Sequence, residues 1–433
     1  MAVNLDVTRW WGQAGMRELL TKLGAEDGLI RFVGGTVRDE LLGIPHADVD
    51  LATRLDPMSV MERLKSTKIK VIPTGIDHGT VTVVSRGQVA EITTLRRDVS
   101  TDGRRATVAF TEDWEEDAAR RDFTINALSA DPVSGEIFDY FGGLGDLKEH
   151  HIRFIGDPLE RIAEDHLRIL RFFRFHARFG SGKLDEAALD ACTARANDLM
   201  ALSRERIADE LLKLLGLPDP AATVGIMLKR AILRPVLPEI EPERLCDLEA
   251  LIAAEGATDI APNALRRLAA LLPRDPELAG TIASRLRLSN KARKRLSCAA
   301  DSDLDHSPRA LAYRVGPDCA TDRFLLAGRT ADAAVIASWS PPRLPIKGGT
   351  LIARGLPEGP VIARTLRKIE DEWVEAGFPT GFGERGGRGP EGDSMELRVG
   401  AVPNRAAGLV RTRDSAGRRT PGVGRIGIVA EGV

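Results

Sequence analysis

Residues 29–50 read LIRFVGGTVRDELLGIPHADVD, and this stretch decides the fold of the N-terminal part of the chain. The apolar run at residues 29–33 is typical of a strand; Gly34 and Gly35 end it, and the residues after them open a helix that carries Arg38. Because glycine has no Cβ, two in a row let the backbone approach a ligand closely. The free N–H groups and positive dipole end of the following helix point to the same place, which favours a phosphate.

The same stretch ends in Asp48, Val49 and Asp50. Alternate side chains of a strand share a face, so both carboxylates are expected to point one way while Val49 packs on the other. Two neighbouring carboxylates repel each other unless a cation lies between them, and ligation by oxygen alone suits Mg²⁺ carrying nucleotide phosphates. A glycine turn is usually only a turn and a lone DxD only a solvated strand end, but together they indicate nucleotidyl transfer.

The composition is that of a globular protein. With 433 residues, 43% hydrophobic and 29% charged, the chain is long enough for two or more domains. We expect a cytoplasmic protein without a membrane span, because no apolar run reaches spanning length and the N-terminus lacks a signal-peptide pattern. The net charge of −2 argues against indiscriminate nucleic-acid binding but allows a basic stripe. The four cysteines are far apart in sequence and are expected to be reduced core residues: Cys192, Cys246, Cys298 and Cys319.

Strand and hairpin signals dominate to about residue 140, and helical patterns follow to about residue 378. This segregated order predicts an α+β head with a small sheet and then a helical extension, not an alternating parallel-sheet protein. Residues 96–109 are polar and interrupted by Gly103, which is typical of a solvated loop. The residues after about 378 are rich in Gly and Arg and are expected to be disordered.

A second motif, RRDFTIN at residues 120–126, lies in a segment expected to be helical from 114 to 128. On a helix Asp122 and Asn126 are one turn apart on the same face. Together with Arg121 they could bind triphosphate oxygens and a ribose hydroxyl, and Asp122 is the natural acceptor for a 2′-OH. The alternative is a helix with ordinary surface charges.

A third motif, EDHLRILR at residues 164–171, is expected on a long helix at residues 159–179, so that Asp165 and Arg168 project from one face. A carboxylate only accepts hydrogen bonds and a guanidinium only donates them. Cytosine and adenine each offer an amino donor beside a ring-nitrogen acceptor, whereas guanine and uracil offer the reverse order. The pair therefore suits C and A and leaves groups unpaired on G and U, at about 1–3 kcal/mol each. The alternative is an intrahelical ion pair of about 0.2–0.5 kcal/mol.

GGTVRDELLG followed by DVD, RRDFTIN and EDHLRILR together resemble the class II nucleotidyltransferases, which are the CCA-adding enzymes and the bacterial poly(A) polymerases. The resemblance covers about residues 25–375 and implies a polymerase-β-like head. It implies that Asp48 and Asp50 bind Mg²⁺ and that Glu91, in the EITT sequence of an expected strand at residues 89–94, is a third catalytic carboxylate. Arg171 is expected to support Asp165 or the phosphates. The nucleotide-binding residues that the resemblance implies are Gly34, Gly35, Arg38, Arg121, Asp122, Asn126, Asp165, Arg168 and Arg171.

The resemblance also divides the chain into a nucleotidyltransferase head (1–145), a neck with the base-selecting helix (146–216), a body (217–305), a tail (306–378) and the extension (379–433). It places a flexible loop needed for the final adenosine at residues 96–109, and a supporting helix that starts at Ser203. A basic cluster at residues 291–295 could contact an RNA backbone.

The expected function is template-independent addition of CCA to tRNA 3′ ends from CTP and ATP, with release of pyrophosphate. No protein partner is implied. Two alternatives stay open. A poly(A) polymerase shares the head and motifs, although TGIDHGTVTV at residues 74–83 resembles the CCA-adding version better. A tRNA-binding protein with an inactive head is the other, and the intact carboxylates and arginines argue against it.

Overall fold

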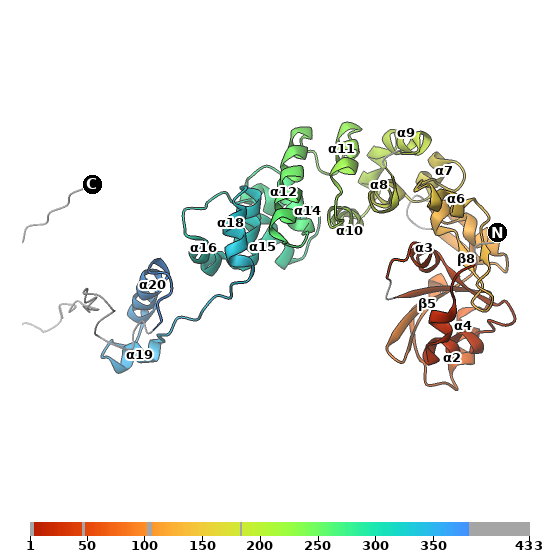
Figure 1. Ribbon diagram of the computed structural model, residues 1–433, viewed down its shortest axis with the longest axis horizontal. Coiled ribbons are helices and arrows are strands. Elements are labelled where there is room, and N and C mark those ends of the chain that lie inside the picture. The colour runs from red at the N-terminus through yellow and green to blue at the C-terminus, as the bar shows by residue number, and fades with distance from the viewer. Residues whose placement is uncertain (1–3, 46–47, 102–105, 182–183, 381–433) are drawn as a thin grey trace, which may run out of the picture. The chain divides into compact units, whose positions relative to one another are not determined.

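The computed structural model describes residues 4–45, 48–101, 106–181 and 184–380 (Figure 1). The chain separates into two compact units. One contains Met1–Arg343 together with Glu370–Phe378, and Leu344–Ile369 belongs to the other. Within the described residues all strands lie before residue 140 and helices fill the rest, which confirms the α+β class (Figure 1).

A seven-stranded sheet with the order β3-β4-β5-β2-β1-β8-β9 organises the head. β2 and β5 run parallel, and the other neighbours are antiparallel. Burial alternates along β4, as expected for a strand with one face in the core. The strands are β1 (Ile30–Val33), β2 (Val49–Thr53), β3 (Lys70–Gly75), β4 (Thr80–Ser85), β5 (Gln88–Thr94), β8 (Ser129–Ala130) and β9 (Ile137–Phe138).

Short helices complete the head. α2 packs against β4 and α4, and the rings of Trp10 and Phe32 lie 4.3 Å apart in the core. Asp56 caps α4 through the N–H groups of Met58 and Ser59, with proline at the first helical position. The helices are α1 (Thr8–Trp11), α2 (Ala14–Lys22), α3 (Gly35–Leu41), α4 (Pro57–Leu64), α5 (Trp114–Ala119) and α6 (Gly143–Lys148), with short 3₁₀ turns η1 (Ile76–His78) and η2 (Thr124–Asn126).

Two predictions for the head are wrong. Residues 114–128 do not form one helix, because α5 ends at Ala119. Phe123, Thr124 and Ile125 have lower helix propensity, and Phe123 instead pairs with Phe154 in a β-bridge. The two ends of the loop expected at residues 96–109 are strands, since β6 (Arg96–Thr101) and β7 (Ala106–Phe110) pair antiparallel, and its middle, residues 102–105, lies outside the described residues. The valines and threonines of this polar stretch have high β propensity, which outweighs its charge.

After the head the first unit is helical. α8 packs against α10, and Ser203 caps α10 as predicted, through the N–H of Arg206. The elements are α7 (Pro158–Glu164), α8 (Arg168–Phe179), α9 (Glu186–Ala194), η3 (Ala196–Ala201), α10 (Arg204–Leu215), α11 (Ala221–Lys229), η4 (Pro242–Arg244), α12 (Leu245–Thr258), α13 (Ala264–Leu271), α14 (Pro276–Arg285), α15 (Asn290–Ala299), α16 (Pro308–Val315), α17 (Pro317–Leu326) and α18 (Thr330–Ala337). In the second unit α19 (Gly348–Ala353) and the start of α20 (Pro360–Glu375) enclose a small core of Ile346, Leu351 and Ile369.

Buried charges join α10 to the helices after it. Arg267 on α13 is 1% exposed and donates to Glu255 and to the carbonyls of Leu215, Leu217 and Pro218. Because each guanidinium donor meets an acceptor, the desolvation of this charge is offset by its hydrogen bonds.

The cysteine prediction is only partly right. Cys192 is buried, but Cys246 is exposed, and Cys298 on α15 forms a disulfide with Cys319 on α17. Distance along the sequence hid this pair because the packing of α15 on α17 brings the two together. No helix among the described residues is long and apolar enough to cross a membrane. The expected disordered extension lies outside the described residues from position 381 onwards.

Candidate active site

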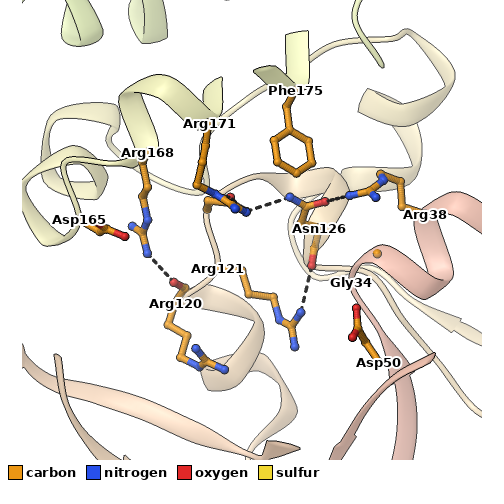
Figure 2. Close-up of a pocket in the computed structure, with 12 residues that line it drawn as sticks. Gly34, Arg38, Asp50, Arg120, Arg121, Asn126, Asp165, Arg168, Arg171 and Phe175 are labelled. Carbon is orange, nitrogen blue, oxygen red and sulfur yellow. Dashed lines mark hydrogen bonds and ion pairs between the residues drawn. The ribbon is translucent and has the colours of Figure 1, made fainter. Parts of the chain in front are cut away.

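A pocket of about 410 Å³ lies where the glycine turn, β2, the segment after α5 and the start of α8 meet (Figure 2). Every residue that the sequence predicted to bind a nucleotide lines this pocket, together with Asp50. Asp48 and Glu91 are not among its lining residues. Two further residues were not predicted, Arg120 and Phe175. The lining residues are Gly34, Gly35, Arg38, Asp50, Arg120, Arg121, Asp122, Asn126, Asp165, Arg168, Arg171 and Phe175.

The glycine turn brings the backbone close to two charged side chains. Gly34 has φ +57° and ψ −119°, a conformation that side chains rarely adopt, and a Cβ there would lie 2.8 Å from Nη1 of Arg121. A Cβ on Gly35 would lie 3.4 Å from Oδ2 of Asp50. The backbone N–H of Asp50 donates to Oγ1 of Thr36 at 2.7 Å, which fixes β2 against the start of α3.

Carboxylates gather at the start of β2. Asp48 precedes the strand, Asp50 lies on it, and Asp50 is the register partner of Glu91 on the parallel strand β5. Burial raises the pKa of Asp50, and the charges of Glu91 and Asp48 raise it further, against the opposing effect of Arg121. The nearby arginines offset only part of the negative charge of these carboxylates. A bound cation would offset the rest, so the carboxylate oxygens fit a divalent metal.

The third predicted carboxylate, Glu91, lies on β5. Among the described residues, no group of three or more His, Cys, Asp or Glu side chains is arranged to hold a metal ion. Glu91 is exposed and, although it is the register partner of Asp50, it is not part of such a group. Its catalytic role stays a prediction.

A row of hydrogen bonds crosses the pocket from α3 to α8. Arg38 donates to Oδ1 of Asn126, whose Nδ2 donates to Oδ1 of Asp122 at 2.9 Å. Arg171 was expected to support Asp165 or the phosphates; in the structure it donates from Nε to Oδ2 of Asp122 at 2.7 Å, and support of the phosphates stays a prediction. Burial alone would raise the pKa of Asp122, but Arg171 and the hydrogen bond from Asn126 lower it below its usual value. Asp122 and Asn126 therefore meet although they do not lie on one α-helix.

The base-reading pair also reaches the pocket by a different route from the one predicted. The helix expected at residues 159–179 is broken: Asp165 has φ −148° and ψ 105°, and its Oδ1 accepts the N–H of Leu167 at 3.2 Å where α8 begins. Asp165 ends α7 outside the helical conformation and α8 begins only at Arg168, so the same-face argument does not apply. Asp165 and Arg168 nevertheless line the same pocket as Asp50 (Figure 2).

Both members of this pair have partners that hold them in place. Asp165 accepts from Nη2 of Arg206 on α10 at 2.7 Å. Arg168 is 9% exposed and donates from Nη1 to Glu164 at 2.6 Å and to the carbonyl of Arg161 at 3.0 Å. Its Nη2 donates to the carbonyl of Arg120 at 2.8 Å (Figure 2). The sequence predicted only that Arg206 lies on a supporting helix, because it lies 41 positions from Asp165 and no sequence pattern connects the two.

The two unpredicted lining residues extend this pattern. Arg120 is the first arginine of RRD, and its pairing with Asp117 three positions earlier was the available signal. Phe175 is 5% exposed, and its ring centroid lies 5.2 Å from the guanidinium carbon of Arg171. A ring in this position supports the arginine through a cation–π contact.

Comparison with known proteins gives a consistent result. A family model described as "Poly A polymerase head domain" matches residues 30–153, and one described as "Probable RNA and SrmB-binding site of polymerase A" matches residues 183–244. The mouse protein "CCA tRNA nucleotidyltransferase 1, mitochondrial" is 33% identical over 383 residues, which cover 84% of this chain and 87% of the mouse protein. The CCA-adding enzyme of Staphylococcus saprophyticus is 40% identical over 200 residues, 46% of this chain and 49% of that enzyme.

Solved structures agree with the sequence matches. The crystal structure of the Bacillus stearothermophilus CCA-adding enzyme in complex with CTP has a TM-score of 0.66 and 28% identity, and the match covers 84% of this chain and 94% of that one. The Thermotoga maritima CCA-adding enzyme complexed with tRNA has a TM-score of 0.62 at 20% identity and covers 87% of this chain and 96% of that one; it supports the fold.

Proposed function

The chain belongs to the CCA tRNA nucleotidyltransferase family, and we propose that it adds C, C and A to tRNA 3′ ends from CTP and ATP without a nucleic-acid template. One observation supports this most strongly. A single pocket is lined by the glycine turn, the Asp50 carboxylate, the row from Arg38 to Asp122, and the Asp165–Arg168 pair. These are groups suited to a triphosphate, a metal, a ribose and a base in turn.

The proposed chemistry is attack of the tRNA 3′-hydroxyl on the α-phosphate of the bound nucleotide, with pyrophosphate as the leaving group. Enzymes of this family use a divalent metal, and we propose Mg²⁺ held by Asp48 and Asp50; when bound, it would lower the pKa of the hydroxyl and neutralise charge on the triphosphate. Glu91, opposite Asp50 in register, is proposed as a further carboxylate near that charge.

The triphosphate and ribose would lie along the glycine turn. Gly34 and Gly35 allow close approach of phosphate oxygens, and Arg121 supplies positive charge next to them. Arg38 and Asn126 hold Asp122 in one hydrogen-bonded row, which favours Asp122 as the acceptor for the 2′-OH and hence a preference for ribonucleotides.

Base selection would follow from what the reading pair can and cannot offer. Asp165 accepts only, and the contacts of Arg168 within the described residues use Nη1 and one hydrogen of Nη2. Its Nε–H and the second Nη2 hydrogen are available to a ring nitrogen of C or A. On G or U an acceptor would face Asp165 and a donor would face Arg168, at about 1–3 kcal/mol for each unpaired group.

The tRNA itself would need positive charge outside the pocket. Lys291, Arg293 and Lys294 are exposed on α15, and within the described residues none of them forms an ion pair. We propose that they contact the phosphate backbone of the tRNA. The head, neck, body and tail division at residues 145, 216 and 305, and a cytoplasmic location, are retained as proposals.

The test is incorporation into a tRNA that lacks its terminal CCA, with each nucleotide supplied alone and together. We expect two additions with CTP, three with CTP and ATP, and none with GTP or UTP. Chains that lengthen past three nucleotides with ATP alone would favour the poly(A) polymerase. Absence of CTP incorporation, with tRNA still bound, would favour an inactive binding protein.

A further inference from the structure

Asp117 is a buried carboxylate that lies behind the pocket and does not line it. Its side chain is on α5, and the residue is 3% exposed. Oδ1 accepts from Nε of Arg120 at 2.9 Å, and Oδ2 accepts from Nη2 of Arg121 at 3.1 Å. Both arginines line the pocket, so one carboxylate outside the site orients two cations inside it.

The charges show why this carboxylate is needed. Arg120 and Arg121 are neighbours in sequence, and both are largely buried. The pKa of Arg120 is lowered to about 10, chiefly by burial and also by the neighbouring charges of Arg96 and Arg121, whereas Asp117 opposes the shift. Without Asp117, these two neighbouring like charges would lose the carboxylate to which both donate, and their side chains would move apart.

Asp117 also reaches two other parts of the head. Its Oδ1 accepts the backbone N–H of Arg96, the first residue of β6, at 3.3 Å. Its pairing with residues three and four positions later fixes the turn that ends α5, and in that turn the carbonyl of Arg120 accepts Nη2 of Arg168 at 2.8 Å. The base of the β6–β7 hairpin, the pocket arginines and the base-reading arginine thus converge on one carboxylate.

We infer that Asp117 is a positioning residue for nucleotide selection, which holds Arg120 and Arg121 for the triphosphate and, through the end of α5, holds Arg168 for the base. The inference rests on the proposed function. Asp117 touches no substrate in this scheme and acts only through these arginines. Its loss should therefore affect nucleotide affinity and base choice together.

The experiment compares wild type with Asp117→Asn, which keeps the size and removes the charge. We expect D117N to raise the Kd of CTP and ATP by about 10- to 100-fold, since the arginines lose charge-assisted hydrogen bonds, and to raise misincorporation of UTP relative to CTP. Asp117→Glu keeps the carboxylate and should recover part of the affinity. Asp117→Ser is measured as a second neutral variant in case D117N does not fold.

The matched control is Asp322→Asn. Asp322 is 0% exposed, and it also pairs with two arginines, Arg266 and Arg295, away from the pocket. D322N should lower thermal stability without changing nucleotide Kd or base choice in the folded protein. If folded D117N or D117S binds and discriminates as wild type does, the inference is wrong. If the wild type itself incorporates no CTP, the proposed function fails instead.

Discussion

Replacement of Gly34 by alanine tests the glycine turn directly. Gly34 has φ +57° and ψ −119°, and a Cβ there would lie 2.8 Å from Nη1 of Arg121. The backbone strain alone should cost about 1–3 kcal/mol of unfolding free energy. The guanidinium is the flexible end of its side chain, so it should move away and give up its hydrogen bonds to the Asn126 carbonyl at 3.3 Å and to Asp117 at 3.1 Å.

The expected result of G34A is therefore a loss of both stability and nucleotide affinity. A displaced charge-assisted hydrogen bond of about 1.5 kcal/mol corresponds to roughly a tenfold higher Kd for CTP and for ATP. Urea unfolding gives the first quantity, and equilibrium nucleotide binding in the presence of Mg²⁺ gives the second.

Gly43→Ala is the matched control. Gly43 also has a positive φ, +66°, and a Cβ there would meet no other atom of the described residues within 4 Å. G43A should lose about 1–2 kcal/mol from backbone strain and keep the wild-type Kd for nucleotides. Equal nucleotide affinity for G34A and G43A would refute the idea that Gly34 leaves room for Arg121 to face the triphosphate.

The other predictions concern the carboxylates, the base pair and the RNA. Because the folded protein raises the pKa of Asp50, its charged form is disfavoured on folding, so at neutral pH it costs stability that acidification through its folded pKa would recover. Asp50→Asn should therefore raise the melting temperature at pH 7 in a chelator while abolishing CTP incorporation and sparing tRNA binding; a lower melting temperature would contradict this. Arg206→Met removes the partner of Asp165, with which it forms a partly exposed ion pair at 2.7 Å. If this ion pair contributes roughly 1 kcal/mol, its loss should reduce discrimination of CTP against UTP by about fivefold in competing single-turnover incorporation. Unchanged discrimination would show that Asp165 needs no such partner. The variant K291Q/R293Q/K294Q removes the cations of α15 and should weaken tRNA binding. It should also reduce the slope of log K against log salt concentration by about 0.7–0.9 for each phosphate that the protein no longer neutralises. The control K65Q, in the head, should change neither quantity.

The features that the sequence predicted well depend on residues close together in the chain. The glycine turn between β1 and α3 and the helix start at Ser203 each need only a few neighbouring residues. The prediction of β1 from the apolar run before Gly34, and that of the Asp50 carboxylate from its alternation with Val49, likewise used only neighbouring residues. Motif matching then brought Asp122 and Asp165 to the right pocket although the secondary structure assigned to each was wrong.

What the sequence did not predict depends on partners far along the chain. Periodicity at residues 159–179 gave no sign that the helix would stop at Asp165 and that a second one would begin at Arg168. The partner of Asp165 is 41 positions away, and Arg171 meets Asp122 across 49 positions. The pairing of Cys298 with Cys319 has the same character, because the packing of α15 on α17 determines it. The pairing of β6 with β7 is local, and it was missed because the charge of the stretch outweighed its β propensity in the prediction.

The buried guanidinium of Arg267 limits which chimeric proteins can be made from this chain and related enzymes. It bonds three carbonyls at the end of α10 and the following turn, and it shares Glu255 with Arg266. A chimera that grafts the helices after residue 218 from another enzyme onto this head must import an arginine and a glutamate with matching reach. Otherwise the junction would leave buried carbonyl groups without hydrogen-bond donors. We expect such chimeras to be destabilised and to aggregate, so that their activities could not be compared.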